Sequence, residues 1–163
     1  MKPAEASLPS ETDVLVKRSF DAPVKLVWRA YMEPELMRRW CGGHPGWSMP
    51  VCEMDMRVGG RYRWRWRSDE DGQEFGFTGE VLEVDLHERI VHTQIFDPGE
   101  LGVSMGGEQS IITVTFDESD GITNVATMIR FASKSDRDDA LATGMTDGME
   151  VSYTRLDKLL TEV

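Results

Sequence analysis

The segment SDRDDALATGMTDGMEVSYTRLDKLLTEV, residues 135–163, decides the predicted fold. Its apolar residues recur at steps of four or of seven, as they do on one face of a helix. They are Leu141, Met145, Met149, Leu156 and Leu160. The acidic residues near its start suit the positive end of a helix dipole. We therefore predict one long C-terminal helix over residues 135–163, with a sheet built around it.

A second row on the same predicted helix consists of small residues, Gly144, Gly148 and Ser152, again spaced by four. A glycine inside a helix costs roughly 0.5–1 kcal/mol relative to alanine, so two of them on one ridge need a reason. Close approach of this ridge to another surface would supply one, and so would space left beside it. We expect space along this glycine side.

The composition excludes several classes of partner. The chain of 163 residues has 18 Lys and Arg against 29 Asp and Glu, which gives a formal net charge of −11. This balance argues against binding to nucleic acid or to anionic membrane surfaces. No apolar run approaches the roughly 20 residues that span a bilayer. Cys41 and Cys52 lack a CxxC spacing, so a disulfide scaffold is not expected.

The N-terminal residues differ in character from the rest of the chain. Residues 1–12 are polar, contain two prolines and have no apolar core of signal-peptide length. We predict that residues 1–12 form a flexible tail, that residues 13–163 form a single domain, and that the protein is cytoplasmic.

The order of the predicted elements indicates the fold class. A first strand over residues 13–20 is followed by two short helices, which begin near Pro23 and Pro34. Short alternating segments then follow one another, joined by turns, as in an antiparallel sheet, so the class is α+β. The predicted strands cover residues 51–56, 61–67, 75–84, 88–96, 108–116 and 122–131. Two glycine-rich loops, residues 41–50 and 97–107, could form the mouth and lid of a cavity.

Five segments carry a resemblance to a known family. They are RSFDAPVKLVWRAYMEPELMRRW (18–40), MDMRVGGRYR (54–63), FTGEVLEV (77–84), ERIVHT (88–93) and GMEVSYTRLDKLL (148–160). Together they resemble the START-like superfamily, also called SRPBCC. Within it, they are similar to the branch named for the C-terminal domain of the activator of heat-shock protein 90 ATPase. Met149 stands where members often carry tryptophan.

The resemblance implies a helix-grip fold. In this fold a seven-stranded antiparallel sheet curls around a long C-terminal helix, two short helices follow the first strand, and a cavity lies between sheet and helix. The resemblance does not imply one function, because members bind lipids or hormones, cyclise polyketides, or assist a chaperone.

Residues 61–67 alternate strictly between aromatic side chains and arginines. The aromatic face, with Met145 and Met149 opposite it, either packs sheet on helix or lines an apolar pocket. By alternation, His92 and Gln94 share a strand face and, with Thr127, are candidate polar anchors. The candidate ligand-binding residues are Trp40, Trp64, Trp66, Phe77, His92, Gln94, Met145, Gly148 and Met149.

The arginine face has two interpretations. Arg61, Arg63, Arg65 and Arg67 either form cross-strand ion pairs with the acidic residues of the return strand or contact an acidic protein partner. Those acidic residues are Glu80, Glu83 and Asp85.

Motifs for metal binding and catalysis are weak. Cys41 and His44 have a spacing that suits two zinc ligands, and Cys52 could be a third, but no fourth ligand is evident. We therefore expect no metal and no cofactor. The chain has no GxSxG, HExxH or phosphate-loop motif, and we assign no catalytic residue.

The leading hypothesis is binding of a small, largely apolar ligand, of unknown identity, between the sheet and the C-terminal helix. The first alternative is a co-chaperone-like domain with a protein partner. The second is a polyketide-cyclase-like enzyme, which would need an ionisable pair in the cavity. Either a monomer or a homodimer is compatible with the sequence, because an exposed strand edge could pair two copies.

Overall fold

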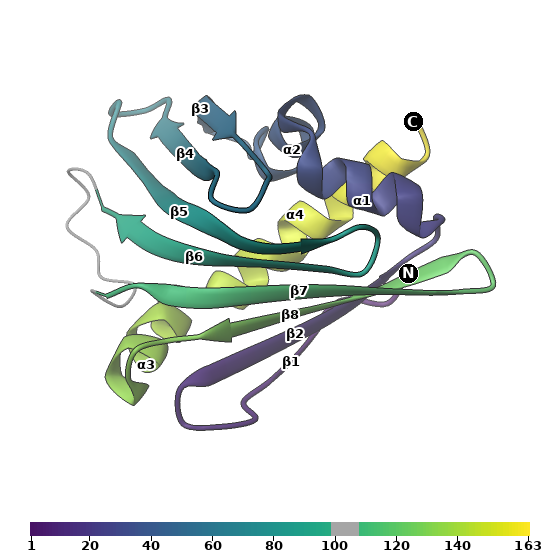
Figure 1. Ribbon diagram of the computed structural model, residues 1–163. Helices are drawn as coiled ribbons and strands as arrows, with labels where there is room; N and C mark the ends of the chain where they lie inside the picture. The colour runs from purple at the N-terminus through teal and green to yellow at the C-terminus, as the bar shows by residue number, and fades with distance from the viewer. Residues whose placement is uncertain (99–107) are drawn as a thin grey trace.

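The computed structural model describes residues 1–98 and 108–163, and within them it has eight strands and four helices (Figure 1). The strands are β1 (Glu5–Ser7), β2 (Asp13–Phe20), β3 (Trp47–Met54), β4 (Arg61–Ser68), β5 (Glu74–Asp85), β6 (Arg89–Asp97), β7 (Ser110–Ser119) and β8 (Ile122–Arg130). The helices are α1 (Val24–Met32), α2 (Pro34–Cys41), α3 (Lys134–Ala142) and α4 (Met145–Leu160). None of the described helices has the length and apolar character needed to span a membrane.

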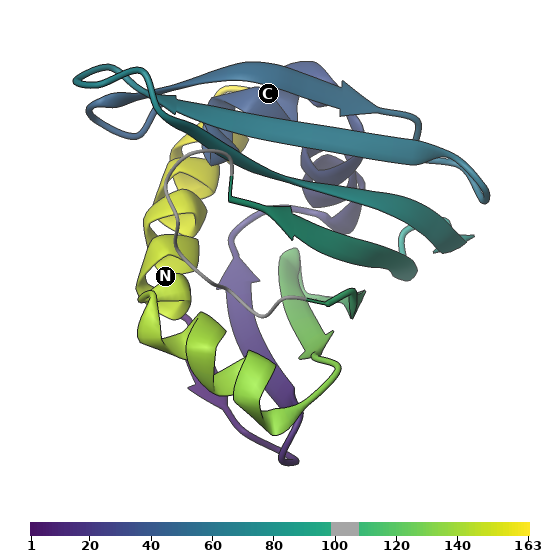
Figure 2. The same ribbon diagram turned by 90° about the vertical axis from the view of Figure 1, so that its left-hand side faces the viewer.

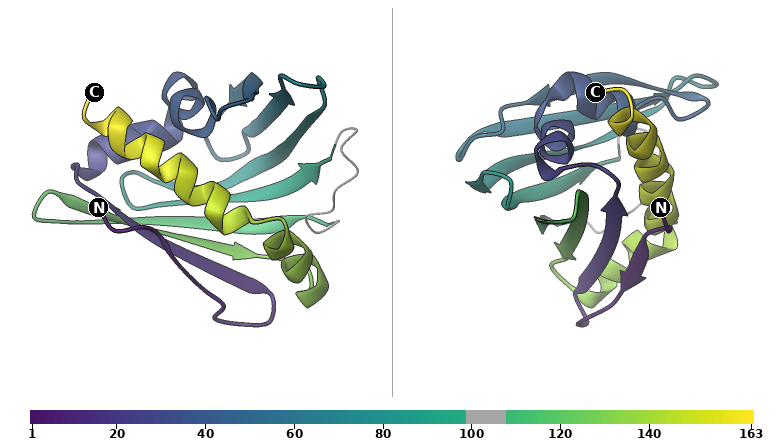
Figure 3. Two further views of the ribbon diagram at one scale, coloured as in Figure 1. Left: turned by 180° about the vertical axis from the view of Figure 1, so that it is seen from behind. Right: turned by 90° about the vertical axis from the view of Figure 1, so that its right-hand side faces the viewer.

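All eight strands belong to one sheet in the order β1-β2-β8-β7-β6-β5-β4-β3, and each neighbouring pair is antiparallel. The sheet is strongly curved, and α4 lies against its concave side (Figure 2). From behind, α4 crosses the sheet diagonally, with α1 and α2 near its C-terminal end and α3 at its N-terminal end (Figure 3). The predicted α+β class and helix-grip arrangement are confirmed.

The core fills the space between the concave face and α4. Alternate residues of β2 are buried, as the pattern of its sequence predicts. The ring of Phe20 packs edge to face on the ring of Tyr153 of α4, with 5.6 Å between the ring centroids. Leu156 of α4 is fully buried. At roughly 25 cal/mol per Å² of apolar surface, such burial is the main force that holds the helix in the sheet.

The predicted single helix over residues 135–163 is wrong, because the segment forms two helices, α3 and α4. The chain turns between them at Gly144, whose φ of 80° lies in the left-handed region that favours glycine. Gly144 therefore lies outside the helical ridge, and only Gly148 and Ser152 remain on it. The apolar spacing misled because Leu141 and Met145 keep a helical separation across the break.

The N-terminal residues include a strand that the sequence did not predict. β1 pairs with β2, and the Ala4 backbone N–H donates to Glu150 Oε1 at 2.8 Å. Part of the segment predicted as a tail is thus an edge strand, and the sheet has eight strands rather than the seven that the resemblance implies. Its pairing satisfies backbone groups that the edge of β2 would otherwise leave open.

Candidate ligand-binding site

The concave face of β4 carries Tyr62, Trp64 and Trp66. The rings of Tyr62 and Trp64 lie 4.3 Å apart, and Trp66 stacks on Phe75 at 5.4 Å. Trp66 Nε1 donates to the Cys41 carbonyl oxygen at 2.9 Å, which ties β4 to the end of α2. Trp64 Nε1 is buried and has no hydrogen-bond partner in the described part of the chain. These aromatic side chains pack against one another and against α2, and the Trp64 indole N–H is a buried donor without a partner among the described residues.

Tyr62 lies over Gly79, its cross-strand partner in β5. A Cβ at position 79 would lie 2.5 Å from a ring carbon of Tyr62, so only glycine leaves room for the ring. The Tyr62 hydroxyl donates to the Thr93 carbonyl oxygen at 2.5 Å, and His92 Nδ1 lies 3.0 Å from the same hydroxyl oxygen. Burial raises the pKa of Tyr62 and lowers the pKa of His92. The pair is therefore neutral near pH 7.

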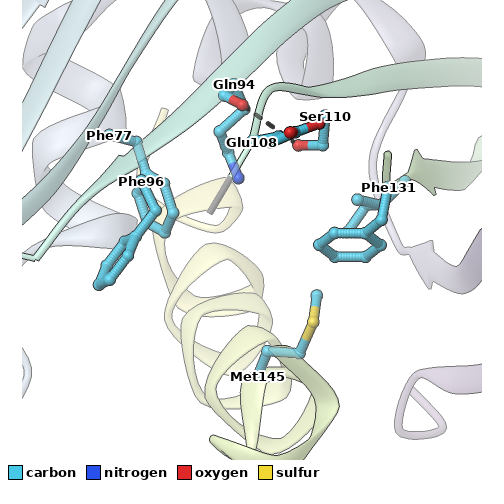
Figure 4. A pocket seen from close by; sticks show the side chains of 8 residues that line it. Phe77, Gln94, Phe96, Glu108, Ser110, Phe131 and Met145 are labelled. Carbon is cyan, nitrogen blue, oxygen red and sulfur yellow. Dashed lines mark hydrogen bonds between the residues drawn. The ribbon is translucent and has the colours of Figure 1, made fainter. Parts of the chain in front are cut away.

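A small cavity lies between the sheet and the first turn of α4 (Figure 4). Its volume of about 20 Å³ holds about one water molecule, whereas pockets for drug-sized ligands are roughly 300–1,000 Å³. Most of its lining is apolar and comes from strands β5 to β8 and from α4. The lining residues are Phe77, Gln94, Phe96, Glu108, Ser110, Ile129, Phe131 and Met145.

Gln94 supplies a polar group to this cavity. Its side chain extends from β6 toward α4 (Figure 4), and its amide makes no hydrogen bond within residues 1–98 and 108–163. The Ser110 hydroxyl is engaged differently, because it donates to the Gln94 backbone carbonyl oxygen at 3.3 Å. A free amide offers two donors and one acceptor, so Gln94 can orient a guest that carries a polar group.

The structure brings together three of the nine candidate residues, Phe77, Gln94 and Met145, around the cavity. His92 lies two residues before Gln94 on β6, but its ring is engaged with Tyr62. Trp64 also lies on the concave face. Neither His92 nor Trp64 lines the cavity, and the same holds for Trp66.

The other candidates lie away from the cavity. Trp40 is in the core, where its ring lies 5.0 Å from Tyr31 and Nε1 donates to the Ala30 carbonyl oxygen. Met149 is half-buried against the core. Gly148 is exposed, and a Cβ there would meet no atom within 4 Å. The expected space beside the glycine is therefore at the surface of α4, not in an enclosed cavity.

Sequence reasoning missed five lining residues, Phe96, Glu108, Ser110, Ile129 and Phe131. Strand alternation could have found three of them, because Phe96 follows Gln94 by two residues, and Ile129 and Phe131 follow Thr127 by two and by four residues. Thr127 itself is buried. Of the predicted lid, residues 99–107 lie outside the described part of the chain.

The two cysteines do not form a zinc site with His44. The Cys41 thiol lies 3.1 Å from Met37 Sδ, and the Cys52 thiol donates toward the Pro34 carbonyl oxygen at 3.6 Å. Burial raises the pKa of both thiols, which favours the protonated form over the thiolate that zinc needs. Among the described residues, no three His, Cys, Asp or Glu side chains are close enough to hold a metal ion.

The arginine face of β4 is only partly paired. Arg65 bonds to Glu74 at 3.0 Å and to Asp97 at 2.5 Å, not to the carboxylates predicted from the sequence. Glu83 pairs instead with Arg89 at 3.5 Å. Exposed Arg61 and Arg63 have no ion pair within the described ranges.

Most of the chain matches the model of one protein family. A family model described as "Activator of Hsp90 ATPase homolog 1-like protein" matches residues 21–161. The chain belongs to this family. Its fold is that of the START-like superfamily, whose members commonly bind hydrophobic ligands, and this general property identifies no ligand here.

Solved structures agree with this assignment. A crystal structure of a protein from Rhodobacter sphaeroides is 26% identical, with a TM-score of 0.89 over 99% of this chain and 100% of that chain. A protein from Nitrosomonas europaea is 26% identical, with a TM-score of 0.80 over 95% of this chain and 97% of its own. A protein from Mycobacterium smegmatis is 23% identical, with a TM-score of 0.83 over 99% of both chains, and this likeness shows the fold alone. No curated protein matches the sequence.

Proposed function

We propose that this chain binds a small, largely apolar ligand between the sheet and α4, at the cavity beside Met145. The observation that carries the proposal is a mostly apolar lining into which the Gln94 amide is directed, without a hydrogen-bond partner in residues 1–98 and 108–163. Apolar burial would supply most of the affinity, and the amide would orient the guest. Members of the superfamily commonly bind hydrophobic ligands, which supports binding of an apolar ligand by this chain.

A cavity of about 20 Å³ must widen to admit such a ligand. Met145 is suited to this because its unbranched side chain has several rotatable bonds and a soft sulfur atom. It also begins α4 directly after the turn at Gly144, so the backbone there is not held within a continuous helix. Binding would therefore displace the Met145 side chain and separate the first turn of α4 from β6.

Nile red, a neutral apolar dye, tests this proposal. We expect saturable one-to-one binding with blue-shifted emission. Met145→Trp should weaken binding by roughly tenfold or more, because the larger ring fills the cavity. Met128→Trp is the matched control, since Met128 lies on the opposite face of the sheet, between buried Thr127 and Ile129. The dye should bind this control like the wild type. Absence of binding, or equal weakening in both variants, would refute the site.

A second candidate function is contact with an acidic protein partner, and exposed Arg61 and Arg63 favour it. Both arginines belong to the convex side of β4 and lack ion pairs in the described residues, in a chain of net charge −11. The family description suggests heat-shock protein 90 as the partner to test. If this is the function, the chain should stimulate the ATPase of that chaperone, and Arg61→Glu with Arg63→Glu should abolish the stimulation without altering Nile red binding.

The enzyme alternative has less support. Glu108 lines the cavity, but it is an exposed residue. His92 and Tyr62 are a buried pair of titratable groups, and burial holds both neutral. No carboxylate hydrogen-bonds to either of them in the described residues. We therefore assign no catalytic role.

A further inference from the structure

Arg155 of α4 differs from the other arginines that are not exposed. Within the described chain, four arginines are buried or half-buried, and three of them pair with carboxylates: Arg18, Arg65 and Arg137. Arg155 has no ion pair and no hydrogen bond there, and its Nε atom is buried without a partner. A cation that has lost water at one donor normally gains a partner in return.

The local sequence explains why Arg155 is unpaired. The helix positions three and four residues away carry no carboxylate, because they are occupied by Val151, Ser152, Lys158 and Leu159. In an acidic chain, this absence leaves a locally positive site at the surface of α4.

Two further groups converge on the same place from the loop after α2. This loop lies beside α4, because α2 packs on α4 (Figure 3). His44 Nε2 lies 3.1 Å from the Ser152 hydroxyl oxygen. Arg155 Nη1 lies 3.1 Å from the point where a Cβ of Gly43 would be, and the φ of 75° at Gly43 also favours glycine. The guanidinium therefore packs directly against the loop backbone.

We propose that Arg155, His44 and Ser152 form a binding site for a small oxyanion, the carboxylate or phosphate group of a small molecule. The guanidinium fork matches the oxygen geometry of both groups, and the hydrogen-bonded pair of His44 and Ser152 keeps an N–H or O–H that can donate to the anion. The net charge of −11 disfavours a polyanion such as nucleic acid, so the ligand is a small molecule.

The electrostatics of His44 agree with this geometry. Burial, and secondarily the nearby Arg155 cation, lower the pKa of His44. A bound anion would oppose the arginine and favour the charged imidazole, so its binding should raise the pKa of His44. The imidazole is thus a reporter placed inside the site.

The oxyanion site is separate from the cavity. Arg155 follows Met145 by ten residues on α4, which is about 15 Å along the helix axis. Nile red binding and oxyanion binding therefore succeed or fail independently.

NMR titration of the His44 imidazole with sodium phosphate and with sodium acetate, at ionic strength held constant with sodium chloride, tests the site. Assignment uses His44→Gln. We expect a saturable shift of the His44 signal and a rise of its pKa with at least one of the two anions. If phosphate alone saturates the site, the ligand carries a phosphate group. If acetate alone saturates it, the ligand carries a carboxylate. If both do, the site accepts either group.

Variants distinguish specific anion binding by Arg155 from a general effect of positive charge on the protein. Arg155→Gln should weaken anion binding by roughly tenfold or more, and Ser152→Ala should weaken it less. Arg63→Gln removes the same charge from an exposed strand and should leave the affinity unchanged. Arg155→Lys keeps the positive charge but lacks the paired N–H donors of the guanidinium, so it should bind the anion with intermediate affinity. This variant replaces Arg155→Gln in the test if Arg155→Gln does not fold. A His44 signal unaffected by both anions, or equal weakening in Arg155→Gln and Arg63→Gln, would overturn the proposal.

Discussion

Arg18 of β2 donates through Nη2 to Asp157 Oδ2 of α4 at 2.7 Å, and so fastens the last helix to a strand at the other end of the sequence. The same guanidinium also donates through Nε to Oε1 of Glu150 at 3.1 Å, and Glu150 lies seven residues before Asp157 on α4. The Arg18 side chain is only 2% exposed, whereas its two partners are 28% and 32% exposed. A single buried cation thus holds two carboxylates of α4 against β2, beside the contact between Phe20 and Tyr153.

Removing this cation should destabilise the domain strongly. Arg18→Met keeps the apolar stem but leaves Glu150 and Asp157 as unpaired neighbouring charges. We expect a loss of roughly 2–3 kcal/mol in the free energy of unfolding, less than for a fully buried pair because both carboxylates can regain water. Urea denaturation at pH 7 measures it. Arg29→Met, which breaks an exposed ion pair with Glu33, should change the stability little. Similar losses in the two variants would contradict the role given to Arg18.

Glu150 should make the stability depend on pH. Burial opposes its ionisation, but hydrogen bonds from Arg18 and from the Ala4 backbone N–H outweigh burial and hold the pKa of this carboxyl below its usual value. A lowered pKa in the folded state gives stability that is present above the unfolded pKa, about 4.3, and is lost as the pH falls through the folded pKa. Urea denaturation between about pH 6 and pH 3 should therefore show a decline in wild type.

The Glu150→Gln variant isolates this contribution. It should be less stable than wild type at pH 7, and its stability should fall less steeply between about pH 5 and pH 3, because the group that takes up a proton is gone. Exposed Glu11→Gln should retain the wild-type slope. If Glu150→Gln kept the full slope, the acid sensitivity would come from other carboxylates.

The fold was largely predictable because its strands and its helical apolar face follow simple periodicities. β2 has the predicted bounds, Asp13–Phe20. β1 could not be predicted in this way, since its three residues, Glu5–Ser7, are exposed and carry no alternation. It forms because β2 offers a free strand edge and Glu150 accepts a hydrogen bond from the Ala4 N–H. Both are tertiary contacts, which a local sequence pattern does not reveal.

The candidate site was predictable only in part. Phe77, Gln94 and Met145 were among the candidate residues, and all three line the cavity. Strand alternation placed Gln94 on the same face as His92. It could not show that Trp40 would be enclosed by Tyr31 and Tyr153, since that depends on how α1, α2 and α4 meet. Nor could it distinguish an open surface at Gly148 from a space inside the domain, because both allow a glycine.

Two glycines with opposite surroundings give a matched pair of substitutions. Gly79→Ala would place a Cβ 2.0 Å from the Thr93 carbonyl oxygen and 2.5 Å from the Tyr62 ring. We expect a loss of about 2 kcal/mol or more, because the backbone or the ring must move. Gly148→Ala meets no atom within 4 Å and lies inside α4, so it should stabilise by about 0.5–1 kcal/mol.

Thermal unfolding distinguishes the two, since 1 kcal/mol corresponds to about 2–4 °C in a domain of this size. Nile red binding should survive Gly148→Ala, which lies outside the cavity. A destabilised Gly148→Ala variant would mean that the α4 surface is covered in solution, and a stable Gly79→Ala variant would contradict the close packing of Tyr62.

Gly144 separates α3 from α4, and its φ of 80° makes a third glycine prediction. An alanine there has space around it but must adopt a left-handed backbone, at a cost of about 1–2 kcal/mol. Asparagine tolerates this region better, so Gly144→Asn should lose less stability than Gly144→Ala. If residues 135–163 instead formed one continuous helix, Gly144→Ala would be the more stable of the two variants and would exceed wild type, because alanine is the better helix former. Urea denaturation of the two variants therefore decides between a break at Gly144 and an unbroken helix.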